Sequence, residues 1–425
     1  MLTKKICILG LGYIGLPTAA MFATNGHQII GVDINEEVVH ELNEARILIK
    51  EPYLDKLVEA AVISGKLKAS MQPEKADVFI IAVPTPIKPD KTADMRYVIE
   101  ATKTIVPYLQ EENIVILEST SPIGTVRDIM APILAESGLV IGEQLLLAHS
   151  PERVLPGRIL IELVENNRII GGINYKSAVA VRDLYKSFVK GRIFLTDATT
   201  AEMCKLMENT YRDVNIALAN ELASICEEIG INAWEVIQLC NKHPRVNILN
   251  PGPGVGGHCI AVDPWFIVEK YPKEAKMIAL ARQINDAKPN YVAQKVDKIL
   301  APIKGKKKIC ILGAAYKANI DDVRESPIIE LIKLLKTRNY DLSIVDPYID
   351  KSSYETEDIL SAAKQSDLIL LGVNHEEFSK IEFKQVSKIM RHRIILDTRG
   401  FFDAEKMAEL GFKYYLLGNG IYREA

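Results

Sequence analysis

The spacing of apolar and polar positions predicts a series of short buried strands at the start of the chain. The apolar runs are KKICILG (4–10), HQIIGVD (27–33), VFIIAVP (78–84) and NIVILEST (113–120), and the last two each follow a charged, helix-like segment. A helix-compatible stretch covers 17–26. Because strands alternate with helices, we expect a parallel sheet covered on both faces.

The middle of the chain has the pattern of helices. Between Thr199 and Gly230 there is no proline or glycine, and apolar residues return at helical spacing, which predicts one long spine helix. A shorter helix is expected around Trp234–Cys240, followed by a Pro/Gly-rich loop at 250–257 that excludes regular structure. The chain becomes helical again over about 273–300.

An internal repeat organises the rest. The seven residues KKICILG recur letter for letter at 307–313, and strand candidates follow at 342–347, 366–373 and 393–400. A chance match is the alternative, because buried first strands of parallel sheets all use Ile, Val, Leu and Cys. The alternation of strands and helices that follows each copy favours two related lobes.

We therefore predict an α/β protein with two Rossmann-like, doubly wound lobes joined by a central helical domain. The expected boundaries are 1–197, 198–300 and 301–425.

Composition excludes several classes of protein. Of 425 residues, 48% are hydrophobic and 25% charged, which excludes disorder and fibrous repeats. The formal charge of −3 provides no basic field for nucleic acid, so no nucleic-acid partner is expected. No apolar run approaches membrane-spanning length, although Lys4 and Lys5 before an apolar stretch imitate a signal peptide.

The six cysteines are widely separated and form no C-x-x-C pair. This pattern fits neither a disulfide framework nor a structural zinc site, and it favours a reducing, cytoplasmic setting.

The motif GLGYIG in the first lobe has dinucleotide-binding spacing. Gly10 permits a tight turn, Gly12 lets backbone N–H groups reach a pyrophosphate, and Gly15 allows close packing of helix on strand. Asp33 ends the next strand, where a carboxylate accepts from ribose hydroxyls and favours NAD over NADP. The alternative is a glycine-rich turn without a ligand.

Polar residues also follow later strands of this lobe. Thr85 and Thr120 lie at the sheet edge where open α/β folds bind ligands, but threonines there also cap helices and start turns. Glu152 and Arg153 add an acid and a base in a loop of the same kind, with a solvated loop as the equal alternative.

The expected spine helix carries Lys205 and Asn209 on one face, and Arg212 nearly continues their stripe. A lysine and an amide together can stabilise a developing oxyanion, while a solvated helical face is the alternative. His243 and Arg245 follow in the segment HPR, where Arg245 would suit a phosphate or carboxylate unless this is a plain surface turn.

The segment GGHCIAVDP contains the candidate nucleophile. Cys259 follows a glycine pair, with Asp263 four residues on, and a helix N-terminus or a nearby lysine would favour its thiolate. His258 lacks a second metal ligand at useful spacing, so no metal is expected. In the second lobe, Lys317 and Arg324 replace the glycines with cations suited to a diphosphate, and Arg399 is placed similarly, unless these charges are simply solvated.

The motifs GLGYIG, VPTP, EST, SPER, KxxxN, GGHCxxxD and YKxNxDDxRxSP, in this order, resemble the UDP-glucose/GDP-mannose dehydrogenase family over nearly the whole chain. HPRVN and GPGVGGHCIAVDPWF are most similar to members that act on UDP-N-acetyl-D-mannosamine. The resemblance implies an NAD-binding domain, a helical dimerisation domain and a UDP-sugar-binding domain, in a homodimer that supplies acidic sugars for polysaccharides.

The implied reaction is an NAD-dependent, four-electron oxidation of the sugar's C6 alcohol to a carboxylate. Cys259 would form a thiohemiacetal and then a thioester, Lys205 and Asn209 would stabilise the oxyanion, and Asp263 would assist. Glu152 and Thr120 are candidates for the water and proton steps. The implied cofactor contacts are Tyr13, Ile14, Asp33, Thr85, Thr120 and Arg324. The implied substrate contacts are Arg153, Val154, Lys205, Asn209, Arg212, His243, Arg245, Gly256, Tyr316, Lys317 and Arg399.

Tyr316 stands where many family members have phenylalanine, so the sequence departs from the family pattern in the segment expected to meet the pyrophosphate. UDP-N-acetylglucosamine and UDP-glucose are alternative substrates. A single-hydride dehydrogenase of the 3-hydroxyacid or 6-phosphogluconate kind shares the Lys-x-x-x-Asn pair but has no use for the cysteine. A non-catalytic NAD or nucleotide-sugar sensor would bind ligand without turnover.

Overall fold

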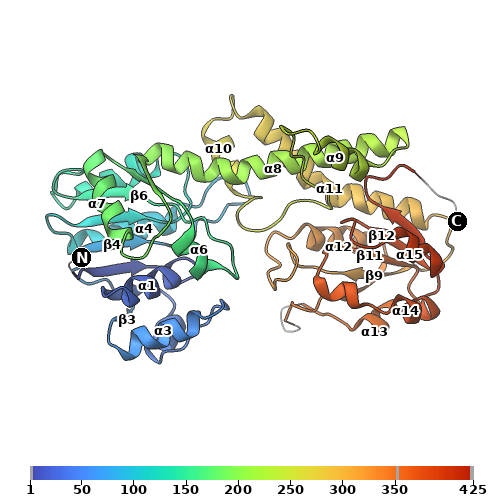
Figure 1. Cartoon of the computed structure of the whole chain (residues 1–425), viewed down its shortest axis with the longest axis horizontal. Coiled ribbons are helices and arrows are strands. Elements are labelled where there is room, and N and C mark those ends of the chain that lie inside the picture. The colour runs from blue at the N-terminus through green and yellow to red at the C-terminus, as the bar shows by residue number, and fades with distance from the viewer. Residues whose placement is uncertain (1–2, 351–353, 422–425) are drawn as a thin grey trace. The chain divides into compact units, whose positions relative to one another are not determined.

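The computed structural model describes residues 3–350 and 354–421. The chain divides into two compact units, Met1–Met207 and Glu208–Ala425 (Figure 1). Each unit has its own core and its own sheet, mostly parallel in the first unit and fully parallel in the second. The predicted α/β class is confirmed: two Rossmann-like sheets and a central run of helices. The finer boundaries at 197/198 and 300/301 remain predictions.

The first unit is built on an eight-stranded sheet with the order β3-β2-β1-β4-β5-β6-β7-β8. Its strands are β1 (Lys5–Leu9), β2 (Gln28–Val32), β3 (Leu67–Ser70), β4 (Val78–Ile81), β5 (Ile114–Leu117), β6 (Leu146–His149), β7 (Arg168–Gly172) and β8 (Ile193–Asp197). The four strands that the sequence predicts are β1, β2, β4 and β5, and they pair in parallel. The one antiparallel pair that the structure describes in this sheet is β6 with β7, which the sequence did not predict.

Helices cover both faces of this sheet (Figure 1). One face is covered by α1 (Gly15–Thr24), α3 (Leu54–Ile63), α6 (Ile159–Glu165) and α7 (Tyr175–Tyr185). The other is covered by α4 (Arg96–Ile105), the π-helical η2 (Thr125–Met130) and α5 (Ala131–Ala135). The short α2 (Glu36–Asn43) and η1 (Val106–Tyr108) complete the unit.

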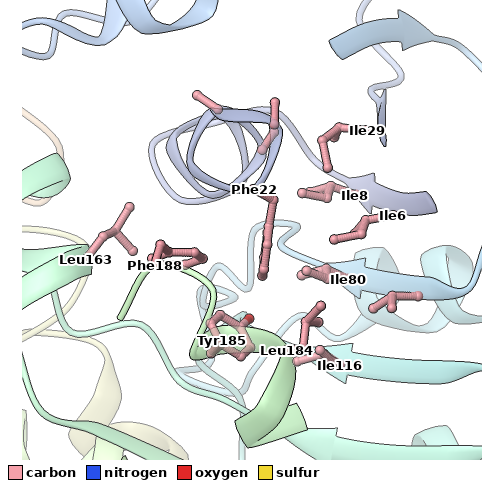
Figure 2. Packing of buried hydrophobic residues seen from close by; sticks show 14 of the residues in the cluster. Ile6, Ile8, Phe22, Ile29, Ile80, Ile116, Leu163, Leu184, Tyr185 and Phe188 are labelled. Atoms are coloured by element: carbon pink, nitrogen blue, oxygen red, sulfur yellow. The ribbon is translucent and has the colours of Figure 1, made fainter. Parts of the chain in front are cut away.

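The core of the first unit is layered by the alternation of strand side chains. Ile6 and Ile8 of β1 face the α1 side, where Phe22 packs on Tyr185 and Phe188 with ring centroids 5.4 and 4.9 Å apart (Figure 2). After the half-buried Lys5, the residues of β1 are buried on both faces of the sheet, as a central parallel strand requires.

The central helices are α8 (Ala198–Ile229), α9 (Ala233–Cys240), α10 (Asp263–Lys270) and α11 (Lys276–Leu300). The predicted spine helix corresponds to α8, which continues from the first unit into the second. The predicted shorter helix and the later long helix correspond to α9 and α11, and 250–257 has no regular structure, as expected. The sequence did not predict α10.

The second sheet has five parallel strands in the order β10-β9-β11-β12-β13. They are β9 (Lys308–Leu312), β10 (Asp341–Val345), β11 (Leu368–Leu371), β12 (Ile394–Asp397) and β13 (Lys413–Leu416). One face packs on α11 and α12 (Pro327–Thr337). The other packs on α13 (Ile359–Ala363), η3 (Glu376–Lys380), α14 (Phe383–Ile389) and α15 (Ala404–Glu409). In the described part of the chain, no helix is long and apolar enough to cross a membrane.

Candidate active site

The turn between β1 and α1 leaves an open stretch of backbone. A Cβ atom on Gly15 would lie 1.9 Å from the Gly10 carbonyl oxygen, and Gly10 itself has φ +93°. Gly12 differs, since nothing lies within 4 Å of its Cβ position and the residue is exposed. Two glycines are thus required by the chain's own packing, and the third leaves room for a ligand.

The acid predicted to contact ribose lies beside this turn. Asp33 follows β2 and accepts hydrogen bonds from Leu11 N (2.9 Å) and Asn35 N (3.0 Å). No side chain caps the N-terminus of α1 at Ile14, and Tyr13 is 40% exposed. An uncapped helix start beside an open glycine and a carboxylate fits the pyrophosphate and ribose of NAD.

The two threonines meet at the ends of neighbouring strands. Thr85 follows β4, Thr120 follows β5, and Thr85 Oγ1 donates to the Thr120 carbonyl oxygen at 2.6 Å. The structure therefore brings this predicted pair together, next to the end of β1.

Glu152 belongs to a buried charged cluster that the sequence did not reveal. Arg168 donates to Glu152 (2.5 Å) and lies 3.6 Å from Glu118, which also accepts from Thr18 (3.3 Å) and Tyr185. Burial raises the pKa of Glu118 to about 7. The sequence contains one local sign of this cluster: Glu118, the first residue of EST, is an acid directly after an apolar strand.

Arg153 and Val154 directly follow Glu152, but their side chains make other contacts. Arg153 donates from its side chain to the Asn167 carbonyl oxygen, and its backbone N–H donates to Glu152 (2.7 Å). Val154 packs against the hydrophobic core of the first unit.

A second residue that the sequence missed is His149, at the end of β6. Its Nδ1 donates to the Leu117 carbonyl oxygen (2.8 Å), and its buried Nε2 has no hydrogen-bond partner among the described residues. Burial lowers the pKa of His149 to about 4, the Leu117 carbonyl opposes this, and the charge of Lys205 on α8 adds to the lowering. A neutral imidazole therefore lies in the electrostatic range of the predicted catalytic lysine.

One turn further along α8, Asn209 contacts the predicted assisting acid. Asn209 Nδ2 donates to Asp263 Oδ2 at 2.6 Å, and both residues are buried. Asp263 begins α10, and its backbone N–H donates to the Cys259 carbonyl oxygen (2.9 Å). The amide on α8 thus holds the segment that carries the candidate nucleophile.

Cys259 itself is half-buried, and its neighbour His258 is 47% exposed. His258 Nδ1 lies 3.7 Å from Asp322 Oδ2 and 3.4 Å from the Arg324 guanidinium. The sequence placed none of these charges beside the cysteine, because the two segments are more than 60 residues apart.

Close backbone approach explains the glycine pair before Cys259. A Cβ atom on Gly256 would lie 2.4 Å from the Glu325 carbonyl oxygen, and one on Gly257, with φ +84°, would lie 2.6 Å from the Tyr316 ring. The cysteine segment therefore packs directly on the loop between β9 and α12.

The remaining predicted substrate contacts are Arg399, Arg212 and Lys317, and the exposed pair His243 and Arg245. Arg399 donates to the Gly372 carbonyl oxygen (2.9 Å) and lies against Gly252, and exposed Arg212 acts electrostatically on Tyr316. Lys317 is an exposed residue of the same loop as Tyr316. His243 and Arg245 are exposed, and within the described residues their side chains contact each other, with an N···N distance of 3.4 Å. Within residues 3–350 and 354–421, no group of three His, Cys, Asp or Glu side chains is arranged to hold a metal ion.

Three family models match most of the chain. They describe the NAD binding domain (residues 4–189), the central domain (199–287) and the UDP binding domain (310–404) of the UDP-glucose/GDP-mannose dehydrogenase family.

Relatives of known name match over almost their full length. The chain is 49% identical to a UDP-N-acetyl-D-mannosamine dehydrogenase of Methanocaldococcus jannaschii, covering 98% of this chain and 97% of the relative. It is 48% identical to an NDP-N-acetyl-D-galactosaminuronic acid dehydrogenase of Ralstonia solanacearum, covering 95% and 98%. The solved structure of UDP-D-ManNAc dehydrogenase from Pyrococcus horikoshii matches with a TM-score of 0.92 and 41% identity, over 98% of this chain and 100% of that one.

Proposed function

The chain belongs to the UDP-glucose/GDP-mannose dehydrogenase family, and from this membership we propose that it oxidises UDP-N-acetyl-D-mannosamine at C6 to the uronate. It is an NAD-dependent oxidoreductase with a UDP-binding domain. The observation that carries the proposed chemistry is the junction of α8 and α10, where Asn209 holds Asp263 one turn beyond Cys259.

NAD, when bound, accepts a hydride in each of two oxidations, so one sugar yields two NADH. The open backbone at Gly12, the uncapped start of α1 and the Asp33 carboxylate support its binding at the first turn. We propose that Tyr13, Ile14, Thr85, Thr120 and Arg324 complete the cofactor contacts.

Cys259 is the proposed nucleophile. Its thiolate adds to the C6 aldehyde, forming a C–S bond, and the carbonyl oxygen takes up a proton to give a thiohemiacetal. Loss of that proton and of the C6 hydride leaves a thioester. Water then adds, the C–S bond breaks, and the carboxylate and the cysteine are released.

Lys205 and Asn209 are proposed to stabilise the C6 oxyanion, because a cation and an amide lie one turn apart on α8. Asp263 positions water or Lys205. Glu152 and Thr120 serve the proton and water steps. The sugar nucleotide is proposed to contact Arg153, Val154, Arg212, His243, Arg245, Gly256, Tyr316, Lys317 and Arg399.

The test counts NADH formed per sugar consumed. Purified protein is incubated with excess NAD and, separately, with UDP-N-acetylmannosamine, UDP-N-acetylglucosamine, UDP-N-acetylgalactosamine, UDP-glucose and GDP-mannose. We expect two NADH per UDP-N-acetylmannosamine and little from the others. The 48% identical relative makes UDP-N-acetylgalactosamine the second candidate substrate.

Replacing the nucleophile separates the competing reactions. Cys259→Ala is expected to abolish the production of two NADH per sugar, whereas Cys204→Ala, elsewhere in the chain, should not. Unchanged turnover with one NADH per sugar would favour a single-hydride dehydrogenase. Ligand binding without NADH from any sugar would favour a sensor.

We propose a homodimer formed through the central helices. Tyr211, Leu218, Ile225 and Ile229 are each more than half exposed and share one stripe of α8. The double variant Leu218→Asp, Ile225→Asp should sediment as a monomer, whereas the wild type should sediment as a dimer. If the wild-type protein itself sedimented with the mass of one chain, 47.4 kDa, the dimer would be excluded.

Six free cysteines support a reducing, cytoplasmic setting.

A further inference from the structure

The strand β7 runs antiparallel to its neighbour β6, and an arginine begins it. Ala148 of β6 pairs with Gly172 at the far end of β7. Continued residue by residue, this register places Arg168 opposite Glu152, in the loop that follows β6. A strand parallel to β6 would place its first residue at the other edge of the sheet. The reversal of β7 therefore brings Arg168 to the edge where open α/β sheets bind their ligands.

Arg168 and Glu152 form a short, buried ion pair at this edge. Arg168 Nη2 donates to Glu152 Oε2 at 2.5 Å, and Arg168 Nη1 donates to Ser150 Oγ at 2.9 Å. The other oxygen of Glu152 accepts from the Arg153 backbone N–H at 2.7 Å. The side chains of Arg168 and Glu152 are only 5% and 7% exposed. Each oxygen of the Glu152 carboxylate is thus held by one hydrogen bond from the fold and keeps a second lone pair.

An aromatic ring and a second acid fix the guanidinium from its other side. Its central carbon lies 4.3 Å from the centroid of the buried Tyr185 ring. Tyr185 donates its hydroxyl to one oxygen of Glu118, and Thr18 of α1 donates to the other at 3.3 Å. Glu118 lies 3.6 Å from Arg168, which is too far for a hydrogen bond. A guanidinium that stacks on a ring and donates to two oxygens cannot rotate without losing these contacts.

The cluster is better suited to fixing a carboxylate than to stabilising the fold. Two acids share one guanidinium, and the attraction within a buried ion pair often fails to offset the loss of hydration. Burial raises the pKa of Glu118 to about 7, Arg168 opposes this shift, and the charge of Glu152 adds to it. Near neutral pH, Glu118 is therefore partly protonated, which leaves more of the charge of Arg168 to Glu152.

We propose that Arg168 is a positioning residue for thioester hydrolysis, which holds the Glu152 carboxylate while it takes a proton from water. The water oxygen bonds to the thioester carbon, the C–S bond breaks, and the sulfur leaves as the thiolate. The proton on Glu152 then returns to the sulfur, and the uronic acid loses its own proton to solvent, so no electrons pass to NAD in this step. The inference rests on the proposed function, in which Cys259 forms the thioester and Glu152 serves the water step.

The test compares the first turnover with the steady state. Rapid mixing with NAD and UDP-N-acetylmannosamine resolves the two phases by NADH absorbance. In the double variant Glu118→Gln, Arg168→Met, the first turnover should still yield two NADH per chain, at a rate within about twofold of the wild type. The steady-state kcat should fall about tenfold or more, because a misplaced base slows hydrolysis alone. The thioester should then accumulate, as added mass on the Cys259 peptide after acid quenching.

The choice of variants separates positioning from folding. Arg168→Met alone would leave two buried acids without their cation, which is strongly destabilising. The double variant removes one acid together with the guanidinium and so keeps the summed charge of the ionised cluster. Glu118→Gln alone is the matched control, since glutamine can still bond with Tyr185 and Thr18, and it should leave kcat within about twofold. Arg168→Lys keeps the charge but not the planar fork, and its kcat should lie between those of the wild type and the double variant.

Two results would overturn the inference. One is wild-type kcat in the folded double variant, and the other is equal slowing of the first turnover and the steady state, which would assign Arg168 to the fold. If Glu152→Gln lowers kcat while the double variant does not, Glu152 keeps its role and the positioning by Arg168 fails. If Glu152→Gln keeps wild-type kcat, or Cys259→Ala still yields two NADH per sugar, the proposed function fails, and the inference with it.

Discussion

The strands β1 and β9 have identical sequences and matching surroundings, yet the turns after them differ. Gly10 N donates to the Val32 carbonyl oxygen and Gly313 N to the Val345 carbonyl oxygen, both at 2.8 Å. In each strand the two isoleucines face one core, and Cys and Leu face the other. The difference in ligand chemistry therefore begins at the residue after the shared glycine.

The first turn exposes its backbone, and the second uses its backbone internally. Gly12 is exposed with open space at its Cβ, whereas the corresponding Ala315 is fully buried. The start of α1 has no side-chain cap, whereas Ser326 caps α12 by accepting from Ile328 N (3.2 Å). Only the first turn keeps N–H groups available for a pyrophosphate.

The acids at the ends of the second strands show the same contrast. Asp33 is half-buried and accepts from Leu11 N and Asn35 N. Asp346 is 6% exposed and accepts from Ala314 N (2.8 Å), Ala315 N (3.2 Å) and His375 Nε2 (3.1 Å). The same sequence position is thus half-buried in the first sheet, where we propose that it contacts ribose, and fully enclosed by hydrogen bonds of the fold in the second.

Making the first turn resemble the second should have the largest effect. Gly15→Ala places a Cβ 1.9 Å from the Gly10 carbonyl oxygen, so the backbone must shift. We expect a loss of about 3 kcal/mol of stability in the first unit and more than tenfold weaker NAD binding by calorimetry. Ala318→Gly, at the corresponding position, is the control and should leave NAD binding unchanged. Wild-type affinity in Gly15→Ala would show that the glycine is not required.

The sequence predicted what depends on local pattern. The repeated strand, the glycine turn and the long helix all show their periodicity or turn chemistry within one segment. Short strands such as β3 and β13 were missed, because four residues with lysines among them lack a clear pattern.

The contacts within the candidate site were beyond local reasoning. Asn209 and Asp263 are 54 residues apart, and their hydrogen bond depends on how α10 packs beside α8. Glu118 and Arg168 meet only because β5 and β7 share a sheet, and burial then alters the pKa of Glu118. Residue types were predictable, but pairing and burial required the fold.

Replacing each of the two acids by asparagine in turn should sharpen the comparison. Asp346→Asn removes a buried acceptor of two N–H groups and should cost about 2 kcal/mol, with little change in NAD affinity. Asp33→Asn should weaken NAD binding about tenfold and change stability less. Both tryptophans, Trp234 and Trp265, lie in the second unit, so urea unfolding followed by tryptophan fluorescence reports the effect of Asp346. Equal effects of both variants on NAD binding would break the contrast.

The cost of Asp346→Asn should depend on pH. Burial would raise the pKa of Asp346, but its bonds from His375 and backbone N–H groups outweigh this and hold it below the ordinary value. A carboxylate with a lowered folded pKa contributes its full stability above an unfolded pKa of about 4, and the contribution is lost as pH falls through the folded value. The difference between wild type and Asp346→Asn should therefore be constant from pH 6 to 8 and shrink below about pH 4. A difference that grew on acidification would contradict this assignment.

Uncapping α12 is the mildest change toward the first turn. Ser326→Ala removes the acceptor for Ile328 N and the donor to the Ala314 carbonyl oxygen (2.8 Å), at a cost of about 1 kcal/mol in the tryptophan-reported transition. No second NAD site should appear by calorimetry, because Asp346 still accepts from Ala314 N and Ala315 N. Ser326→Thr keeps the hydroxyl and should recover most of the loss. If Ser326→Ala bound a second NAD, the cap alone would distinguish the two turns, and the buried acid would be irrelevant to that difference.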